Sequence, residues 1–343
     1  MKLSQLRDVV AVAETGSLRA AGRHLGIAQP AITRSIREIE HELGVTLFER
    51  HAKGVRLTDI GRAFVRRAES VQSELRRAEE EIAQLKGQFT GEIALAVSTA
   101  SAMSILPRAL QQFRKTYPEV VLKISETFFA PIERDLLGGR TDFYVGPFEM
   151  GSTANTFIVE KLFDNQRLVV ARRGHPLARA SSIAELTDVQ WIRPAVAERL
   201  TEGDFAQALV ELGLPNPRIA IHSRSALITI LTVANTDLLT VLPQQWLDFS
   251  LTAPLVEALP LPALHAAPIC IVRRHDMPLT PLAEHLCDLM RRAGHTMRTR
   301  WCRHSKLLAQ AAGSGWATDT AARPVLVAST SETGQEDPRH ATC

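Results

Sequence analysis

The chain has 343 residues, of which 45% are hydrophobic and 22% are charged, and its formal net charge is +3. This length predicts two domains, and this composition is typical of a soluble globular protein. No apolar run in the sequence approaches the roughly 18 residues of a membrane span, and the N-terminal residues lack the pattern of a signal peptide. We therefore expect a cytoplasmic protein with no membrane segment.

The four cysteines all lie in the last quarter of the chain, and none are paired in a CxxC spacing. This distribution argues against a disulfide framework and against an ordinary zinc site. Cys302 and His304 form too short a cluster to predict a metal site. We expect neither a metal nor a cofactor.

Positive charge gathers in the first fifth of the chain. Residues 1–67 contain 12 Lys or Arg against 7 Asp or Glu, a net charge of +5, which leaves −2 for the remaining residues. A basic N-terminal region on a nearly neutral body suits a contact with nucleic acid.

Three short helices are predicted at the N-terminus. Apolar residues recur at spacings of three and four from residue 3, and Gly16 ends this first helix. Ser17 is placed to cap a second helix, which ends at Gly26. A third helix is predicted to begin near Pro30, because proline is tolerated in a first helical turn.

The third helix has two distinct faces. Its apolar residues step by four, three and four, and they predict one buried stripe: Ile32, Ile36, Ile39 and Leu43. The opposite face carries amide, hydroxyl and guanidinium groups: Gln29, Thr33, Arg34 and Arg37. Two helices joined by a tight glycine turn, the second with such a face, are typical of a helix-turn-helix. These groups are suited to base edges and nearby phosphates.

Residues 45–58 are predicted to form a hairpin. Apolar residues flank a turn region that carries Arg50, Lys53 and Arg56. This arrangement is typical of a wing whose charges contact the phosphate backbone. The alternative is a three-helix packing module with a solvated charged face.

Residues 16–61 resemble the DNA-binding head of LysR-type transcription regulators almost throughout, including the Gln-Pro-Ala start of the third helix and the Leu-Phe-Glu-Arg sequence of the wing. The resemblance implies binding to a dyad-symmetric promoter site in double-stranded DNA, with RNA polymerase as a further partner. It implies DNA contacts by Gln29, Pro30, Thr33, Arg34 and Arg37, with Arg50 and Lys53 on flanking phosphate or minor groove.

The sequence departs from this family at Ala28, where members usually have Ser or Thr. The hydroxyl that normally caps the third helix is therefore missing. An Ala at this position should cost roughly 0.5–2 kcal/mol of helix capping, and any phosphate contact by that hydroxyl is absent.

A long helix is predicted from the cap residue Thr58 to about Phe89. Its apolar residues alternate in steps of four and three, as in a coiled coil: Phe64, Ala68, Val71, Leu75, Ala78, Ile82, Leu85 and Phe89. A helix of this length would span about 48 Å. The resemblance implies an antiparallel dimerising linker, with a homodimer or homotetramer as the assembly. The alternative is a helix packed on the sensor region of its own chain.

Strands and helices alternate from Gly91 onwards, which predicts a parallel sheet with helices on both faces. The predicted strands lie at 93–97, 120–125, 142–146, 168–171, 191–193, 218–221, 238–241 and 269–272, with helices at 106–113, 132–137, 205–212, 226–234 and 281–292. The chain leaves a first lobe and later returns to it, which predicts two lobes with a ligand cleft between them.

The expected fold is therefore α/β, with an all-α winged helix-turn-helix head and a two-lobed effector domain that resembles periplasmic binding proteins. We place the head at 1–58, the linker at 59–90, the effector domain at 91–296 and a disordered tail at 297–343. The first lobe covers about 91–163 and 266–296, and the second about 164–265.

Candidate effector-binding residues follow the first strand of the sensor, where hydroxyls at a helix N-terminus favour anions. The resemblance implies an effector-binding role for this turn, with arginines of the second lobe opposite it. The full set comprises Ser98, Thr99, Ser101, Phe129, Gly146, Arg193 and Arg224. Ser and Thr in such turns also serve as plain helix caps, so a structural role is the alternative.

Residues 233–243 and 273–281 resemble a LysR-type subgroup that includes the toluenesulfonate-degradation regulator. This resemblance implies an aromatic carboxylate or sulfonate as effector. The competing interpretation is an enzyme, or a simple small-molecule-binding protein, that uses the same cleft. The sequence contains no GxSxG elbow, P-loop or HExxH motif, so we expect a regulator and not an enzyme.

Overall fold

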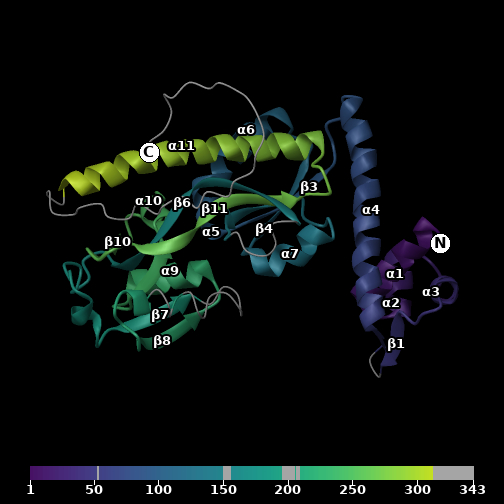
Figure 1. Ribbon diagram of the computed structural model, residues 1–343, viewed down its shortest axis with the longest axis horizontal. Helices are drawn as coiled ribbons and strands as arrows, with labels where there is room; N and C mark the ends of the chain where they lie inside the picture. The colour runs from purple at the N-terminus through teal and green to yellow at the C-terminus, as the bar shows by residue number, and fades with distance from the viewer. Residues whose placement is uncertain (52–53, 150–155, 195–204, 206–208, 312–343) are drawn as a thin grey trace, which may run out of the picture.

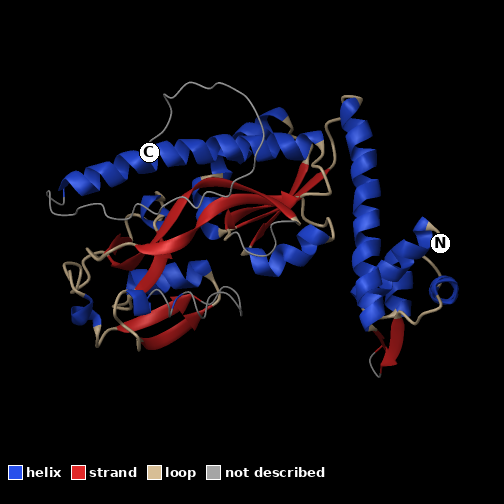
Figure 2. Cartoon of the chain, viewed as in Figure 1, coloured by secondary structure: helices blue, strands red, loops and turns tan. Residues whose placement is uncertain are grey.

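The computed structural model describes residues 1–51, 54–149, 156–194, 205 and 209–311. A helical head lies at the N-terminal end of one long helix, and this helix runs along the side of a domain of strands and helices (Figures 1 and 2). None of the helices in these ranges has the length and hydropathy needed to cross a bilayer.

The head contains three helices and a hairpin, as predicted. The helices are α1 (Leu3–Thr15), α2 (Leu18–Leu25) and α3 (Gln29–Leu43), and strands β1 (Phe48–His51) and β2 (Gly54–Leu57) form the antiparallel wing. Short loops join these five elements, so the head is compact.

Local capping explains where the head helices begin. The hydroxyl of Ser17 accepts a hydrogen bond from the backbone N–H of Ala20 at 3.4 Å, which caps α2 as expected. Ala28 precedes α3 without any side-chain cap. The third helix therefore relies on its buried stripe. Ile32 and Ile39 are fully buried. Leu43, which was expected in the buried stripe, is 39% exposed and lies outside the core.

The long helix α4 spans Asp59–Leu85 and is capped by Thr58, whose hydroxyl accepts the N–H of Gly61 at 2.8 Å. Its 27 residues correspond to about 40 Å. The helix ends before the expected residue, Phe89, because Gly87 adopts a left-handed φ of +80° and the N–H of Gln88 bonds back to Ala83.

A mixed seven-stranded sheet forms the centre of the effector domain. Its strand order is β10-β6-β11-β5-β3-β4, and β9 also pairs with β6. The strands are β3 (Glu92–Val97), β4 (Val121–Glu126), β5 (Phe143–Pro147), β6 (Phe157–Arg172), β9 (Thr240–Pro243), β10 (Val256–Ala258) and β11 (Leu264–Arg274). Strands β7 (Gln190–Pro194) and β8 (Arg218–Ser223) form a separate parallel pair.

The prediction of a parallel sheet was wrong for the connecting strands. Strand β3 is parallel to β4 and β5, but β11 is antiparallel to both β5 and β6. The reason is topological: the chain crosses between the lobes in β6 and returns in β11, and the two strands run in opposite directions.

Strands β6 and β11 connect two lobes with separate cores. Lobe I, built on β3, β4 and β5, has a core around Phe113, Phe143 and Leu286. Lobe II, built on β7 to β10, has cores around Trp191 and Ile192. The remaining helices are α5 (Thr99–Ser104), α6 (Leu106–Thr116), α7 (Phe129–Leu137), η1 (Ile183–Leu186), α9 (Ala226–Asn235), α10 (Gln245–Asp248) and α11 (Pro281–Ala311).

The C-terminal region differs from the expectation of a disordered tail from residue 297. Helix α11 begins at Pro281, as predicted, but it continues to Ala311. The expected tail beyond Ala311 and residues 206–208 of the expected helix at 205–212 lie outside the described residues, whereas 205 and 209–211 are helical.

Candidate DNA-binding and effector sites

The predicted DNA-reading residues lie together on the solvent face of α3. Gln29, Pro30, Arg34 and Arg37 are exposed. The side chain of Arg34 is 81% exposed and pairs with Glu38 at 3.4 Å, one helical turn away. An exposed pair of this kind contributes little stability, so the guanidinium can exchange this partner for a phosphate or a base.

Thr33 lies on the same face but is half-buried, and its hydroxyl donates to the carbonyl oxygen of Gln29 at 3.0 Å. This bond holds the threonine side chain against its own helix. The methyl group of the threonine is consequently better placed than its hydroxyl for a contact outside the helix.

The wing is held in place by a residue that the sequence analysis missed. One carboxylate oxygen of Glu40 accepts the N–H groups of Leu47 at 2.7 Å and of Phe48 at 3.1 Å. An acidic residue in the last turns of a helix is unfavourable for the helix dipole, and this is the signal that could have identified Glu40. Arg50 is exposed on β1, whereas Lys53 lies outside the described residues.

Helix α4 has two faces with different surroundings. Of its predicted apolar seam, Phe64 and Ala68 pack in the core of the head. Further along the helix the seam is exposed, with Val71 at 45%, Leu75 at 42% and Ile82 at 54% of full exposure. A second, polar face is buried against the effector domain of the same chain: Glu69, Ser73, Arg77 and Gln84. Packing of α4 on the sensor region of its own chain, the alternative interpretation, is thus present on this face, while the dimer predicted from the exposed face stays a prediction.

The predicted effector-binding hydroxyls lie where β3 ends. The hydroxyl of Ser98 accepts the N–H of Ser101 at 3.2 Å, and the two hydroxyl oxygens lie 3.0 Å apart. Both residues are buried, and the N–H of Ser98 donates to Val145 of β5 at 2.9 Å. Ser98 therefore caps α5 and ties the end of β3 to β5.

Thr99 has a partner that the sequence analysis did not anticipate. Its hydroxyl donates a short hydrogen bond to the carboxylate of Glu126, at the end of β4. A carboxylate at this position opposes the binding of an anion, so this contact weakens the case for Thr99 as an anion ligand.

The two predicted arginines lie at the carboxyl ends of the lobe II strands. Arg193 is half-buried in β7 and stands opposite His222 of β8, while Arg224 is exposed directly after β8. Helix α5 meets the same lobe, since Met103 packs against the core around Ile192. Helix α5, which begins directly after β3, therefore reaches lobe II near its C-terminal end.

Phe129 and Gly146 have clear packing roles. The ring of Phe129 lies 4.6 Å from that of Phe148 and 5.8 Å from that of Tyr144, measured between centroids. A Cβ at Gly146 would lie 2.1 Å from the Tyr144 hydroxyl oxygen and 2.9 Å from the Cβ of Ser98. The close approach of Tyr144 therefore requires glycine at position 146. These packing roles of Phe129 and Gly146 do not depend on a contact with an effector.

A pocket of about 600 Å³ lies elsewhere in lobe II, beside the start of β7, the middle of β8 and the loop before β9. Its walls are mainly apolar, with a few polar groups, and it is lined by His175, Pro176, Leu177, Val189, Gln190, Ala220, Ile221, Thr236, Asp237 and Leu238. Ligands of open α/β sheets usually bind at the carboxyl ends of the strands, so this pocket is distinct from the predicted site.

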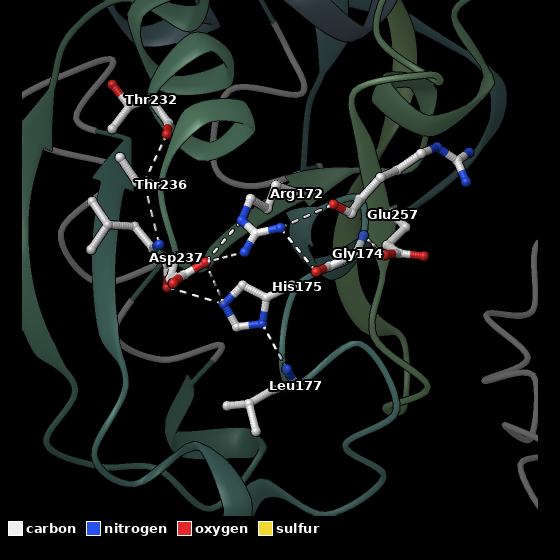
Figure 3. A network of polar contacts seen from close by, with 10 residues as sticks. Arg172, Gly174, His175, Leu177, Thr232, Thr236, Asp237 and Glu257 are labelled. Carbon is white, nitrogen blue, oxygen red and sulfur yellow. Dashed lines mark hydrogen bonds and ion pairs between the residues drawn. The ribbon is translucent and has the colours of Figure 1, made fainter.

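A polar network fixes one side of this pocket (Figure 3). Arg172 pairs with the carboxylate of Asp237 at 2.7 Å and donates to the carbonyl of Gly174 at 2.9 Å. His175 is buried, contacts the carbonyl oxygen of Asp237 through Nε2 at 3.2 Å, and accepts the N–H of Leu177 at Nδ1 at 3.0 Å. The turn after β6 is thereby tied to the loop before β9.

The fold and these sites correspond to one family. Residues 3–62 match the family model described as "Bacterial regulatory helix-turn-helix protein, lysR family", and residues 86–294 match the "LysR substrate binding domain". The chain therefore belongs to the LysR family of transcription regulators. It is a DNA-binding regulator with a domain for a small-molecule effector, and its relatives are regulators and not enzymes.

Two relatives carry the same name. The "HTH-type transcriptional regulator GbpR" of Rhizobium radiobacter is 29% identical over 253 residues, which cover 72% of this chain and 83% of that protein. The protein of that name from Azospirillum brasilense is 28% identical over 304 residues, covering 88% and 89%.

Solved structures show the same fold over most of the chain. A full-length OxyR variant from Pseudomonas aeruginosa has a TM-score of 0.63 at 25% identity and covers 85% of this chain and 95% of that one. CbnR in complex with its target DNA has a TM-score of 0.61 at 21% identity and covers 85% and 100%.

Proposed function

We propose that this regulator binds a dyad-symmetric promoter site as a homodimer or homotetramer, with α3 reading bases and the wing contacting phosphates. The observation that carries the proposal is the exposed face of α3, where Gln29, Arg34 and Arg37 stand opposite the buried side chains of Ile32, Ile36 and Ile39. Gln29, Pro30, Thr33, Arg34 and Arg37 form the proposed base-reading set, with Arg50 and Lys53 on the backbone.

The assembly is proposed from the exposed seam of α4. Apolar residues at heptad spacing that lie on the surface of a monomer are suited to a second helix of the same kind. A symmetric dimer would place two heads on two half-sites, as dyad-symmetric recognition requires. A contact with RNA polymerase is also proposed, and in vitro transcription from the bound promoter tests it.

The proposed effector is a small anion, an aromatic carboxylate or sulfonate, bound between the lobes. Ser98, Thr99 and Ser101 lie at the carboxyl end of β3, and Arg193 and Arg224 lie at the carboxyl ends of the lobe II strands, where ligands of such sheets bind. Each charge-assisted hydrogen bond contributes roughly 1.5–3 kcal/mol, so a few suffice for micromolar affinity.

Isothermal calorimetry with paired acids and neutral amides tests this proposal. Benzoate and benzenesulfonate are expected to bind more tightly than benzamide, and Arg193→Gln to weaken the acids selectively. If the neutral compounds bind equally well, the site does not recognise anions.

The pocket of lobe II is a second candidate position for the effector, because its 600 Å³ lies within the usual range for small ligands. Ile221→Arg would fill this pocket without touching the end of β3. Loss of effector binding in Ile221→Arg, with unchanged binding in Arg193→Gln, would move the effector to this pocket.

A further inference from the structure

A buried ion pair joins the linker helix to the effector domain, and a second pair, between Glu69 of α4 and Arg140, lies beside it at 2.5 Å. Nη2 of Arg77 lies 2.6 Å from Oδ1 of Asp142, and each side chain is only 6% exposed. Nη1 of Arg77 also donates to the carbonyl of Pro278 at 3.2 Å. Asp142 accepts the backbone N–H of Ala94 at 2.8 Å through its other oxygen. The pair thus joins α4 to β3, to the start of β5 and to the segment before α11.

Neighbouring contacts extend this attachment along α4. The hydroxyl of Ser73 donates to the carbonyl of Gly138 at 2.9 Å, after α7. The amide oxygen of Gln84 accepts the N–H of Leu282 at 3.0 Å, in the first turn of α11. From Ser73 to Gln84 the helix rises about 16 Å. Contacts at both ends of this stretch, with an ion pair between them, fix the direction of the helix as well as its position.

The attached strands lead directly to the proposed effector site. Ala94 lies in β3, and Asp142 immediately precedes β5, which is parallel and hydrogen-bonded to β3. At their other ends the same strands reach Ser98 and Gly146. Ala94 and Ser98 are four residues apart, or about 13 Å in an extended strand. A strand of this length transmits a displacement along its axis without stretching.

We propose that Arg77 is a positioning residue: through Asp142 it fixes α4, and with α4 the DNA-binding head, to lobe I, so that the head and lobe I move as one body. An effector that draws lobe II towards lobe I then changes the spacing of the two heads in the dimer. The link to the effector rests on the proposed function, whereas the attachment of α4 to lobe I does not.

The structure also provides a covalent substitute for the ion pair. A Cβ built at Gly138 lies 3.8 Å from the Cβ of Glu69 on α4, and disulfides have Cβ–Cβ distances of about 3.5–4.5 Å. Gly138 has a φ of −79°, which any residue adopts. The double variant Glu69→Cys/Gly138→Cys is therefore expected to form a disulfide between α4 and lobe I under mild oxidation.

The test measures the distance between the head and lobe I in the full-length protein. Nitroxide labels are attached through ketone-bearing amino acids at the exposed positions Arg19, on α2, and Lys115, on α6. Labelled subunits are mixed with excess unlabelled subunits, so that only pairs within one chain are measured by pulsed electron paramagnetic resonance. The intact protein is expected to give one narrow distance distribution.

Arg77→Met is expected to broaden the distribution or split it, because the remaining charge of Asp142 is buried without its partner. When Arg77→Met is combined with Glu69→Cys and Gly138→Cys, oxidation is expected to restore the narrow distance distribution, and reduction is expected to broaden it again. Arg76→Met is the matched control, since Arg76 pairs with Glu80 within α4, and it is expected to leave the distribution narrow.

A narrow and unshifted distribution in folded Arg77→Met would overturn the proposal. If that variant does not fold, Arg77→Met/Asp142→Leu replaces both charges with apolar side chains, a change that buried pairs often tolerate. A broadened or split distance distribution in this double variant supports the proposal, and a narrow, unshifted one overturns it. If the Glu69→Cys/Gly138→Cys variant, with Arg77 kept, forms no disulfide, this result would also count against the packing of α4 on lobe I. None of these measurements requires an effector. The attachment of α4 to lobe I can therefore be disproved while the proposed effector site stands, and the effector site can be disproved while the attachment stands.

Discussion

The hydroxyl of Thr99 is bound to the carboxylate of Glu126, so the turn proposed to receive an anion already faces a negative charge. Glu126→Gln removes this charge but keeps an amide oxygen that can accept the hydroxyl. If the effector is an anion at this site, the variant should bind benzoate or benzenesulfonate more tightly, by about 1 kcal/mol or more for one charge at partly exposed positions. Calorimetry measures the change. Equal or weaker binding of the acids by Glu126→Gln, with benzamide unaffected, would separate the anion site from Thr99.

Arg34→Ala should reduce specific DNA binding by about 1–3 kcal/mol and relax the sequence preference at one position of each half-site. Lys53→Ala should instead weaken binding to all sequences alike, because a phosphate contact carries no base information. Quantitative footprinting on specific and random duplexes distinguishes these effects. The assignment of α3 fails if Arg34→Ala protects the specific site at the same concentration as the unchanged protein.

Leu75→Glu should break the pairing of α4, because it places a charge at the centre of the exposed apolar seam. The change is expected to halve the mass measured by light scattering, and to abolish binding to a site with two half-sites while single-half-site binding persists. Arg66→Glu, also exposed on α4 but outside the seam, is the control for the mass measurement. If the unchanged protein has the mass of a monomer at the concentration used for DNA binding, the seam does not pair with α4 of a second subunit.

Gly54→Ala should destabilise the head and displace the wing. Gly54 has a φ of +140°, and an added Cβ would lie 2.3 Å from the carbonyl oxygen of Gly16. The backbone strain alone costs about 1–3 kcal/mol, and the contact adds to it. Gly87→Ala, at a φ of +80° with no atom within 4 Å of the added Cβ, isolates the conformational cost, about 1–2 kcal/mol. Thermal unfolding should therefore show the larger loss for Gly54→Ala, and an equal loss would mean that the contact with Gly16 is absent.

The thiols of Cys270 and Cys287 should resist alkylation in the folded protein. Burial raises the pKa of Cys270 to about 11 and that of Cys287 to about 12. A raised pKa lowers the thiolate population at pH 8, and the thiolate is the reactive form. In a Cys302→Ser/Cys343→Ser background, reaction with Ellman's reagent should be slow until the protein is unfolded or the pH approaches 11. Rapid reaction of both thiols at pH 8 would contradict this burial.

The sequence by itself determined the local structure of the head. The cap at Ser17 and the missing cap at Ala28 are confirmed, and so is the predicted stripe at Ile32, Ile36 and Ile39 but not at Leu43. These features depend on residues a few positions apart, so periodicity and capping rules suffice to identify them. The two-lobed fold followed from alternating strands and helices, and the resemblance at residues 16–61 indicated the family.

Only the tertiary structure decided which groups meet across the chain. Arg77 and Asp142 belong to different domains of the sequence, and nothing in the pattern of α4 distinguishes Arg77 from the exposed Arg66. The Thr99–Glu126 contact likewise depends on the pairing of β3 with β4. Strand directions of β6 and β11 were mispredicted for the same reason. Such contacts depend on how distant elements pack, and a local pattern of residues carries no information about that packing.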